Sequence, residues 1–439
     1  MADSSVAQFR RVSQSDTALC LSGGGYRAAL FHLGAIRRLN ELGVLSRVAV
    51  VTSVSGGSIL AGLLAARWSR LRADSRGICP NFDEEVASPI RAFCSMDIRT
   101  NLVLGHRLNP MNWFALAGSL LSISGNVLAR SYHSMFGDML LREIPEADCH
   151  TPRFVFCATS MNTGACWQFH SGHDGRMGDF YTGYASTGDV SVAEAVAASS
   201  AFPLAFAPFG LDRTRMIEFS RVDHWGRTRP VSGKRGSVAC DRFLLTDGGV
   251  YDNLGLEPVW SMSNTILSSD GGLPFESVST CRPFLVNRLE RVAAISNEQV
   301  GAVRKRFLVD KFVTKARLGA LWAIDTLIDD YGVVGAPGYR GDARYRLSRI
   351  RTDLNSFSQP EMASLENHGY SLADIALKSR VPQLVPSPAP AFTWPHPEWS
   401  PEDRVNIALA QSADRQIGHD IWSWFRGSLR IRRRSKQPQ

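Results

Sequence analysis

The chain has 439 residues, of which 44% are hydrophobic and 21% are charged, a balance that can fill a sizeable core and predicts a globular protein. Its net charge of +8 indicates an anionic partner, without choosing among phospholipid surfaces, nucleic acids and acidic proteins. No uncharged apolar run reaches the roughly 18 residues that a spanning helix needs. The eight cysteines lack the spacing of a metal finger or a C-x-x-C pair, so we expect reduced, mostly buried thiols.

Alternating strand and helix signals begin after the polar segment Met1–Asp16. That segment lacks the apolar stretch of a secretory signal, so we expect a cytoplasmic protein. The predicted order is a strand at Thr17–Leu21, a helix at about Tyr26–Leu42, a strand at Val48–Val54 and a helix at Gly56–Arg67. Such alternation predicts a parallel sheet covered by helices.

The middle of the chain adds further strands and helices. Buried strands are predicted at Phe154–Thr159, Arg242–Thr246 and Asn264–Leu267, and a helix at Val192–Ser200, which Asp189 or Ser191 could cap. From Leu289 to Tyr331 we expect one long helical run, whose basic residues are interpreted as a solvated face.

The first of three motifs is Ser22-Gly-Gly-Gly-Tyr-Arg-Ala28, directly after the first predicted strand. Three glycines let the backbone approach a reacting group closely, and the helix that follows directs its free N–H groups and positive dipole end to the same point. Gly23, Gly24 and Gly25 are therefore candidates for an oxyanion hole.

The second motif is Ser53-Val-Ser-Gly-Gly57, between the second strand and the second helix. A strand, a tight turn with small residues and a helix form the nucleophile-elbow arrangement, which exposes a serine hydroxyl on a strained turn. Ser55 is the candidate nucleophile, and Ser53 and Ser58 are nearby alternatives.

The third motif is Thr246-Asp-Gly-Gly249, at the end of the apolar run that begins at Arg242. A carboxylate at a strand end can accept the proton of a serine hydroxyl if burial raises its pKa above the usual value of about 3.9. Asp247 is the candidate base. Of the other Asp-Gly pairs, Asp174 lies in a polar loop, whereas Asp270 follows a predicted strand and is the main competitor.

Together and in this order, the three motifs resemble the patatin-like phospholipase family. The likeness includes three more segments and extends over about residues 15 to 270, whereas the helical remainder matches only loosely. The three segments are Ala158-Thr-Ser-Met-Asn-Thr-Gly164, Ala198-Ser-Ser-Ala-Phe-Pro203 and Asn253-Leu-Gly-Leu-Glu-Pro258. The resemblance implies a three-layer α/β/α fold with a mostly parallel central sheet and a helical C-terminal extension.

The resemblance also implies a serine–aspartate dyad without a catalytic histidine, and hydrolysis of phospholipid or other lipid esters through an acyl-enzyme. Carried over, Ser55 attacks and Asp247 is the base. Gly23, Gly24 and Gly25 would supply oxyanion amides, and Arg27 would order their loop; Ala28 replaces a glycine that is frequent in the family. No metal and no organic cofactor is implied.

The expected domain organisation has four parts. They are a flexible N-terminus at 1–15, a patatin-like acyl hydrolase domain at 16–380, a proline-rich linker or strap at 381–401, and a C-terminal helix with a basic tail at 402–439. The apolar segment Trp113–Leu128 is a candidate wall or lid for an acyl chain, or a plain core helix.

The final helix is expected at about Glu402–Phe425. Aromatic residues at Ile421–Phe425 precede six basic residues, so the tail could hold an anionic membrane surface or pack on the main domain. Lipid is the expected partner, no nucleic acid is expected, and the oligomeric state is left open.

Three alternatives remain. The glycine motif also fits a dinucleotide-binding fingerprint, but the acidic residue Glu41 lies on the helix rather than at the end of the second strand. A Ser-His-Asp α/β-hydrolase with His368, His396 or His419 is disfavoured because only one strand precedes that of Ser55. The third is a patatin-fold lipid-binding module whose dyad is inactive.

Overall fold

The computed structural model describes residues 16–98, 123–148, 151–203, 206–216, 220–222, 228–230, 240–275, 277, 285–410 and 412. The strands are β1 (Thr17–Leu21), β2 (Val48–Val54), β3 (Ile123–Ser124), β4 (Arg153–Ser160), β5 (Cys166–His170), β6 (Arg176–Asp179), β7 (Gly183–Ser186), β8 (Phe206–Ala207), β9 (Phe209–Asp212), β10 (Ser220–Val222), β11 (Thr228–Pro230), β12 (Arg242–Asp247), β13 (Thr265–Asp270) and β14 (Leu318–Ala323). The helices are α2 (Gly25–Glu41), α3 (Gly56–Arg67), α4 (Ser88–Cys94), α7 (Gly125–Phe136), α8 (Val192–Ser199), α9 (Gly249–Asp252), α10 (Leu285–Val313), α11 (Gly341–Ser348), α12 (Gln359–Arg380) and α13 (Glu402–Leu409).

The centre of the fold is a parallel group of strands in the order β14-β13-β1-β2-β4. Beyond β4 the 12-stranded sheet continues with antiparallel strands, namely β5, β6, β7, β10 and β11 on the main path and β12 and β9 as a branch from β4. A separate pair joins β3 and β8. The predicted α/β class with a parallel central sheet is confirmed, and the antiparallel extension adds to it.

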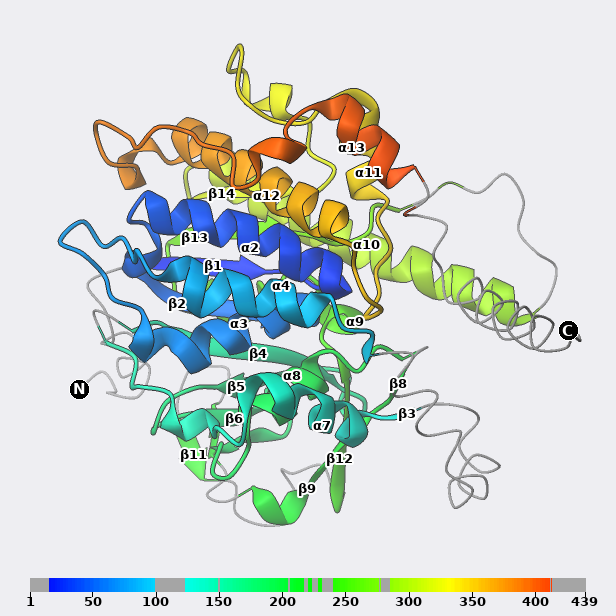
Figure 1. The fold of residues 1–439 in the computed structure, drawn as a ribbon. Coiled ribbons are helices and arrows are strands. Elements are labelled where there is room, and N and C mark those ends of the chain that lie inside the picture. The colour runs from blue at the N-terminus through cyan, green and yellow to red at the C-terminus, as the bar shows by residue number, and fades with distance from the viewer. Residues whose placement is uncertain are drawn as a thin grey trace, which may run out of the picture.

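Two apolar cores cover the two faces of the sheet, which gives three layers. In β1, Leu19 and Leu21 belong to one core and Ala18 and Cys20 to the other, as the alternation of side chains along a strand requires. Because both faces are buried, such a strand is continuously apolar in sequence. Figure 1 shows α2, α4 and α12 in one layer in front of the strands and α10 behind them.

Helix α2 crosses α12 at a point where both helices carry glycine. A Cβ on Gly34 would meet the Glu366 carbonyl oxygen at 1.8 Å, and one on Gly369 would meet the Phe31 carbonyl oxygen at 1.8 Å. Only glycine permits this close approach of two helix backbones. The contact fixes α12 over the helix that follows the glycine loop.

The predicted elements in the first unit agree with the structure to within one residue at each end. Strands β4, β12 and β13 and helix α8 also lie where the sequence predicted them, within three residues. Ser191 caps α8 by accepting a hydrogen bond from the Glu194 amide. Continuous apolar runs bounded by glycine or serine were therefore a sufficient signal for the buried strands.

The predicted helical run from Leu289 to Tyr331 is wrong in its second half. Helix α10 ends at Val313, and the segment Leu318–Ala323 is strand β14, which pairs with β13 in parallel. A short apolar run cannot be assigned to helix or strand by periodicity alone, and here the pairing with β13 decides. The sequence analysis also missed α12, because its buried faces leave no clear apolar stripe.

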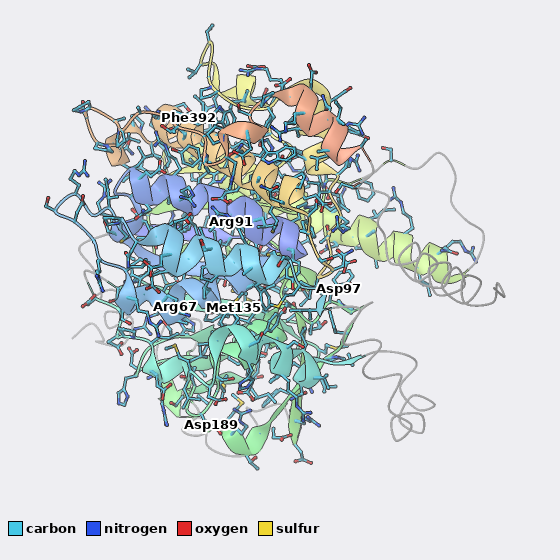
Figure 2. All side chains as sticks on the ribbon, in the orientation of Figure 1. Arg67, Arg91, Asp97, Met135, Asp189 and Phe392 are labelled. Atoms are coloured by element: carbon cyan, nitrogen blue, oxygen red, sulfur yellow. The ribbon has the colours of Figure 1, made fainter. Side chains whose placement is uncertain are left out.

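The segment between Val381 and Pro401 contains only two short 3-10 turns and lies against α12 and α2. Its Phe392 ring packs edge-on against Tyr370 of α12, and the carbonyls of Pro390 and Ala391 accept hydrogen bonds from Arg38. Figure 2 shows Phe392 near α12 at the upper edge of the molecule.

Several predicted segments lie outside the described residues. These are the N-terminus at 1–15, most of the apolar segment Trp113–Leu128, whose end forms β3 and the start of α7, and the C-terminal tail beyond α13 apart from Ala410 and Ser412. No helix in the described ranges is long and apolar enough to cross a membrane.

Gly369→Ala is expected to lower the free energy of unfolding by about 1–3 kcal/mol, because the added methyl group must push α12 away from α2. Gly301→Ala in α10 is the matched control, since nothing lies within 4 Å of the added Cβ, and it should leave stability unchanged or raise it by up to about 1 kcal/mol. Urea denaturation measures both. Equal effects of the two substitutions would contradict the proposed close packing.

Candidate active site

Ser55 occupies the tight turn between β2 and α3 with a φ of 50° and a ψ of −117°. Only one other non-glycine residue in the described ranges, Lys315, has a positive φ. The next two positions have no room for a side chain, since a Cβ on Gly56 would meet the Gly25 carbonyl oxygen at 2.0 Å and one on Gly57 the Leu21 carbonyl oxygen at 2.5 Å. The strained turn predicted for a nucleophile elbow is therefore present.

The neighbouring serines have structural partners. Ser53 and Ser58 are fully buried, and the Ser58 hydroxyl donates to Ser53 Oγ at 2.9 Å. Ser58 Oγ also lies 2.8 Å from Ser199 Oγ. Ser55 is only partly buried, so it is the accessible hydroxyl of the three.

Ser199, at the end of α8, connects the elbow to the Asp247 turn. Its Oγ accepts a hydrogen bond from the Ser55 amide at 3.0 Å and donates to the Cys157 carbonyl at 2.6 Å. Its own carbonyl accepts from the Gly248 amide at 3.1 Å, and the Asp247 amide donates to the Ala201 carbonyl at 3.0 Å. Ser199 belongs to the segment Ala198–Pro203, which resembles the family but carries no pattern that predicts this role.

Asp247 reaches the same place along the same edge of β4 as Ser55, because β12 pairs with β4 just beyond the point where β2 ends, while β5 occupies the other edge. Strand β12 runs antiparallel to β4 and pairs Asp247 with Ala158, while β2 pairs Val54 with Cys157, so Ser55 and Asp247 arrive at neighbouring levels. We had expected the carboxylate at the end of a strand parallel to the others. The antiparallel strand delivers it at the same edge because β12 overlaps β4 only over its last residues.

The environment of Asp247 suits a base. Burial raises the pKa of its carboxyl group to about 6, against hydrogen bonds from the Ser55 side chain and from the Gly249 amide, which lies 2.7 Å from Oδ1. Only 4% of the residue is exposed. At neutral pH the group is still mostly ionised and can accept a proton.

The glycine loop lies against the elbow. A Cβ on Gly23 would come within 3.1 Å of Ser55 Cβ, and both Gly24, with a φ of 145°, and Gly25, with a φ of 59°, have backbone conformations that favour glycine. The Gly23 amide donates to the Asn253 carbonyl at 3.1 Å, so it is already engaged. The Gly24 and Gly25 amides make no hydrogen bond to another residue in the described part of the chain.

Arg27 is fully buried and binds the backbone on which the glycine loop rests. Its guanidinium donates twice to the Gly271 carbonyl, at 2.8 and 3.1 Å, and once to the Ile350 carbonyl at 2.8 Å. A Cβ on Gly24 would meet that same Gly271 oxygen at 2.6 Å. Burial lowers the pKa of Arg27 to about 10, which leaves it charged at neutral pH.

The competing carboxylate Asp270 belongs to this support. Its Oδ2 lies 2.5 Å from Lys305 Nζ on α10, and its Oδ1 accepts the Gly272 amide at 2.9 Å. Burial alone would raise its pKa, but the Lys305 charge and these hydrogen bonds outweigh burial and lower it. Asp174, the other alternative, pairs with Arg153 in an exposed loop.

His32, His368 and His396 have partners outside the candidate dyad. His32 bonds to the Ser22 carbonyl at 2.9 Å and to Ser269 Oγ at 2.7 Å, and His368 bonds to the Ile324 carbonyl at 2.8 Å. Burial lowers the pKa of each to about 4, so both are neutral. His396 pairs with Glu366, and His419 lies outside the described residues. No cluster of three or more metal-ligating side chains occurs in the described ranges.

Fold and site together define an α/β protein with an accessible elbow serine beside a buried carboxylate. Residues 19–260 match the family model described as patatin-like phospholipase. This is more than half of the chain, which therefore belongs to the patatin-like phospholipase family. No individual curated protein sequence matches it.

Solved structures with a similar backbone include human GIVD cytosolic phospholipase A2, with 12% identity and a TM-score of 0.46 over 94% of this chain and 63% of that chain. The same human protein in complex with methyl gamma-linolenyl fluorophosphonate gives 15% identity and a TM-score of 0.42 over 94% and 62%. VipD from Legionella pneumophila is 15% identical, with a TM-score of 0.31, and the match covers 84% of this chain and 67% of that chain. The chain thus spans less than two thirds of the human protein, and these similarities carry no argument about activity.

Asp270→Asn is expected to lower the free energy of unfolding by about 1–3 kcal/mol, because Lys305 loses its charged partner beside the glycine loop. Asp247→Asn should leave the melting temperature nearly unchanged, since it removes a carboxylate that burial already destabilises. Ester hydrolysis should show the reverse order, with the larger loss in Asp247→Asn. Loss of activity confined to Asp270→Asn would identify Asp270 as the base.

Proposed function

We propose that this protein is a lipid acyl hydrolase of the phospholipase A type, with Ser55 as nucleophile and Asp247 as general base. The single observation that carries the proposal is the meeting of the Ser55 turn with the buried Asp247, whose carboxyl group interacts with the Ser55 side chain and has its pKa raised to about 6 by burial. Membership in the patatin-like phospholipase family supports a lipid ester as substrate.

In the proposed first step, Ser55 Oγ attacks the ester carbonyl carbon while its proton passes to Asp247. The C=O electron pair moves to oxygen, and the amides of Gly24 and Gly25 stabilise this oxyanion. Gly23 is assigned a different role from the one expected, because its amide holds the loop to Asn253. Loss of one oxyanion donor raises a barrier by about 3 kcal/mol, so this loop matters nearly as much as the nucleophile.

Collapse of the intermediate breaks the bond to the alcohol oxygen, which leaves with the proton held by Asp247, and an acyl-serine remains. A water molecule then attacks the acyl carbon and gives its proton to Asp247. The fatty acid leaves, and Ser55 recovers its proton. No metal or organic cofactor enters this sequence.

Parts of the proposal reach beyond the described residues. We assign residues 16–380 to the hydrolase domain, 381–401 to a strap and 402–439 to a C-terminal helix and tail. The segment Trp113–Leu128 as a wall for the acyl chain, the tail as a membrane anchor and a cytoplasmic location stay predictions.

Two of the alternatives, the inactive lipid-binding module and the Ser-His-Asp enzyme, make different predictions. A lipid-binding module with an inactive dyad would bind vesicles without releasing fatty acid. A Ser-His-Asp enzyme needs a histidine near Asp247, but the described histidine rings discussed above bond to other groups.

Ser55→Ala should reduce fatty acid release from mixed phospholipid vesicles by about a thousandfold or more, because the acyl-enzyme cannot form. Ser53→Ala is the control, since it removes a hydroxyl two positions away that bonds to Ser58. Release is measured by mass spectrometry of the free fatty acid. Equal rates in wild type and Ser55→Ala, or no release by the wild type, would reject the proposed function.

The pH dependence should report the raised pKa of Asp247. Because the base must be ionised, kcat/KM for a soluble short-chain ester should be full above about pH 7, half-maximal near pH 6, and fall about tenfold per pH unit below. Circular dichroism at each pH confirms that the protein stays folded. A midpoint near 4 would mean that a solvated carboxylate, not the buried Asp247, is the base.

A further inference from the structure

Helix α10 carries large apolar side chains that nothing in the described structure covers. Its C-terminal half packs on the domain through the buried Leu308 and the partly buried Phe312, whereas nearly every described residue before position 301 is exposed or only partly buried. Figure 1 shows the helix extending away from the sheet and its covering layers. No atom outside the backbone of the helix lies within 4 Å of a Cβ added to Gly301, which agrees with the exposure of this part of the helix.

Four of the exposed apolar side chains of α10 lie on one face of the helix, namely Leu289, Val300, Val303 and Phe307. Ala293 and Ser296 complete this face, which we call the stripe, and the Phe307 ring also packs edge-on against Trp260. Leu289 is 60% exposed, Val303 55%, Phe307 47% and Val300 40%, and Val292, 60% exposed, flanks the same face. Large unburied apolar side chains in such a row mark an interaction surface.

Helix α10 adjoins the loop that supports the candidate oxyanion hole. Lys305 lies two positions from Val303 and Phe307, and so on the opposite face of α10 from the stripe, where it makes the ion pair with Asp270. The neighbouring Gly271 contacts the glycine loop. The loop that follows Asp270 exposes Leu273 and Phe275, and the Phe275 ring lies 4.2 Å from the Arg291 guanidinium of α10. An apolar surface thus extends from α10 to the loop that supports the proposed oxyanion hole.

The charge around the stripe selects the partner. Helix α10 contains six basic and three acidic residues, in a chain with a net charge of +8. Two copies of this helix packed together would bring like charges into contact, which disfavours self-association. Apolar residues along one face of a basic helix are the features with which helices lie in the interface of an anionic lipid layer.

We propose that the apolar stripe of α10, together with the Leu273–Phe275 loop, binds an anionic lipid surface and so brings lipid esters to Ser55. The link to catalysis rests on the proposed function, whereas the binding itself does not. The family match ends at residue 260, before α10 begins, so the surface belongs to a part of the chain outside that match.

The test uses the full-length chain with Ser55→Ala, so that binding is measured without hydrolysis. Co-sedimentation compares neutral phosphatidylcholine vesicles with vesicles enriched in phosphatidylglycerol, at low and high salt. The triple variant Leu289→Gln, Val292→Gln, Val303→Gln should weaken binding to the anionic vesicles by about tenfold or more. The matched control is Val309→Gln with Val313→Gln, which changes two exposed apolar residues on another face of the same helix and should bind as the parent does.

Other partners give different results. Unchanged vesicle binding in the triple variant overturns the proposal, and so does binding that is lost only in a tail variant, Trp422→Gln with Trp424→Gln. Sedimentation velocity tests a second copy: a dimer that the triple variant disrupts, with vesicle binding intact, would assign the stripe to self-association and equally overturn the proposal.

A second measurement separates binding from chemistry in the active enzyme. The triple variant should hydrolyse a soluble short-chain ester at the parent rate. Its rate of fatty acid release from anionic vesicles should be lower than the parent rate by about tenfold or more. Equal losses on both substrates would mean that the substitutions disturb the site and would overturn the proposal. A wild type that hydrolyses neither substrate would reject the proposed function, while the co-sedimentation result would still decide whether α10 binds lipid.

Discussion

The positive φ of Ser55 is the constraint on which the rest of the site depends. Such a conformation costs on the order of 1–3 kcal/mol for a residue with a side chain, and it persists only when the surroundings hold it in place. Here Ser199 binds the Ser55 amide, and the backbones of Gly56 and Gly57 press against the glycine loop. These contacts therefore hold the turn in which the Ser55 side chain interacts with the Asp247 carboxyl group.

A second set of contacts extends from this turn to the helices beyond the family match. The glycine loop lies on Gly271, whose carbonyl binds Arg27, and the adjacent Asp270 pairs with Lys305 of α10. Two buried charges of opposite sign thus support the glycine loop. The same contacts join α10 to the candidate site, so the proposed lipid-binding surface and the proposed catalytic residues belong to connected parts of the fold.

The sequence was sufficient for the parts of the fold whose signal is local. Strands β1 and β2 and the turn at Ser55 follow from apolar runs and small residues, and the proximity of Ser55 and Asp247 followed from the family resemblance. The sequence was insufficient where pairing between distant strands decides the structure. It did not predict that β12 runs antiparallel to β4, and it predicted a helix where β14 pairs with β13. Ser199 and the second Asp-Gly-Gly could not be interpreted because a hydroxyl or carboxylate that supports a neighbour has no pattern of its own in sequence.

Covalent labelling tests the central claim, that a Ser55–Asp247 dyad attacks esters, most directly. The intact protein is treated with an alkyl fluorophosphonate, which phosphonylates activated serine hydroxyls with loss of fluoride, and the adduct is located by peptide mass spectrometry. The account predicts one adduct on Ser55, formed far more slowly in Asp247→Asn and unaffected by Ser53→Ala. An adduct on another serine, or labelling of Ser55 at the same rate without the Asp247 carboxylate, would contradict it.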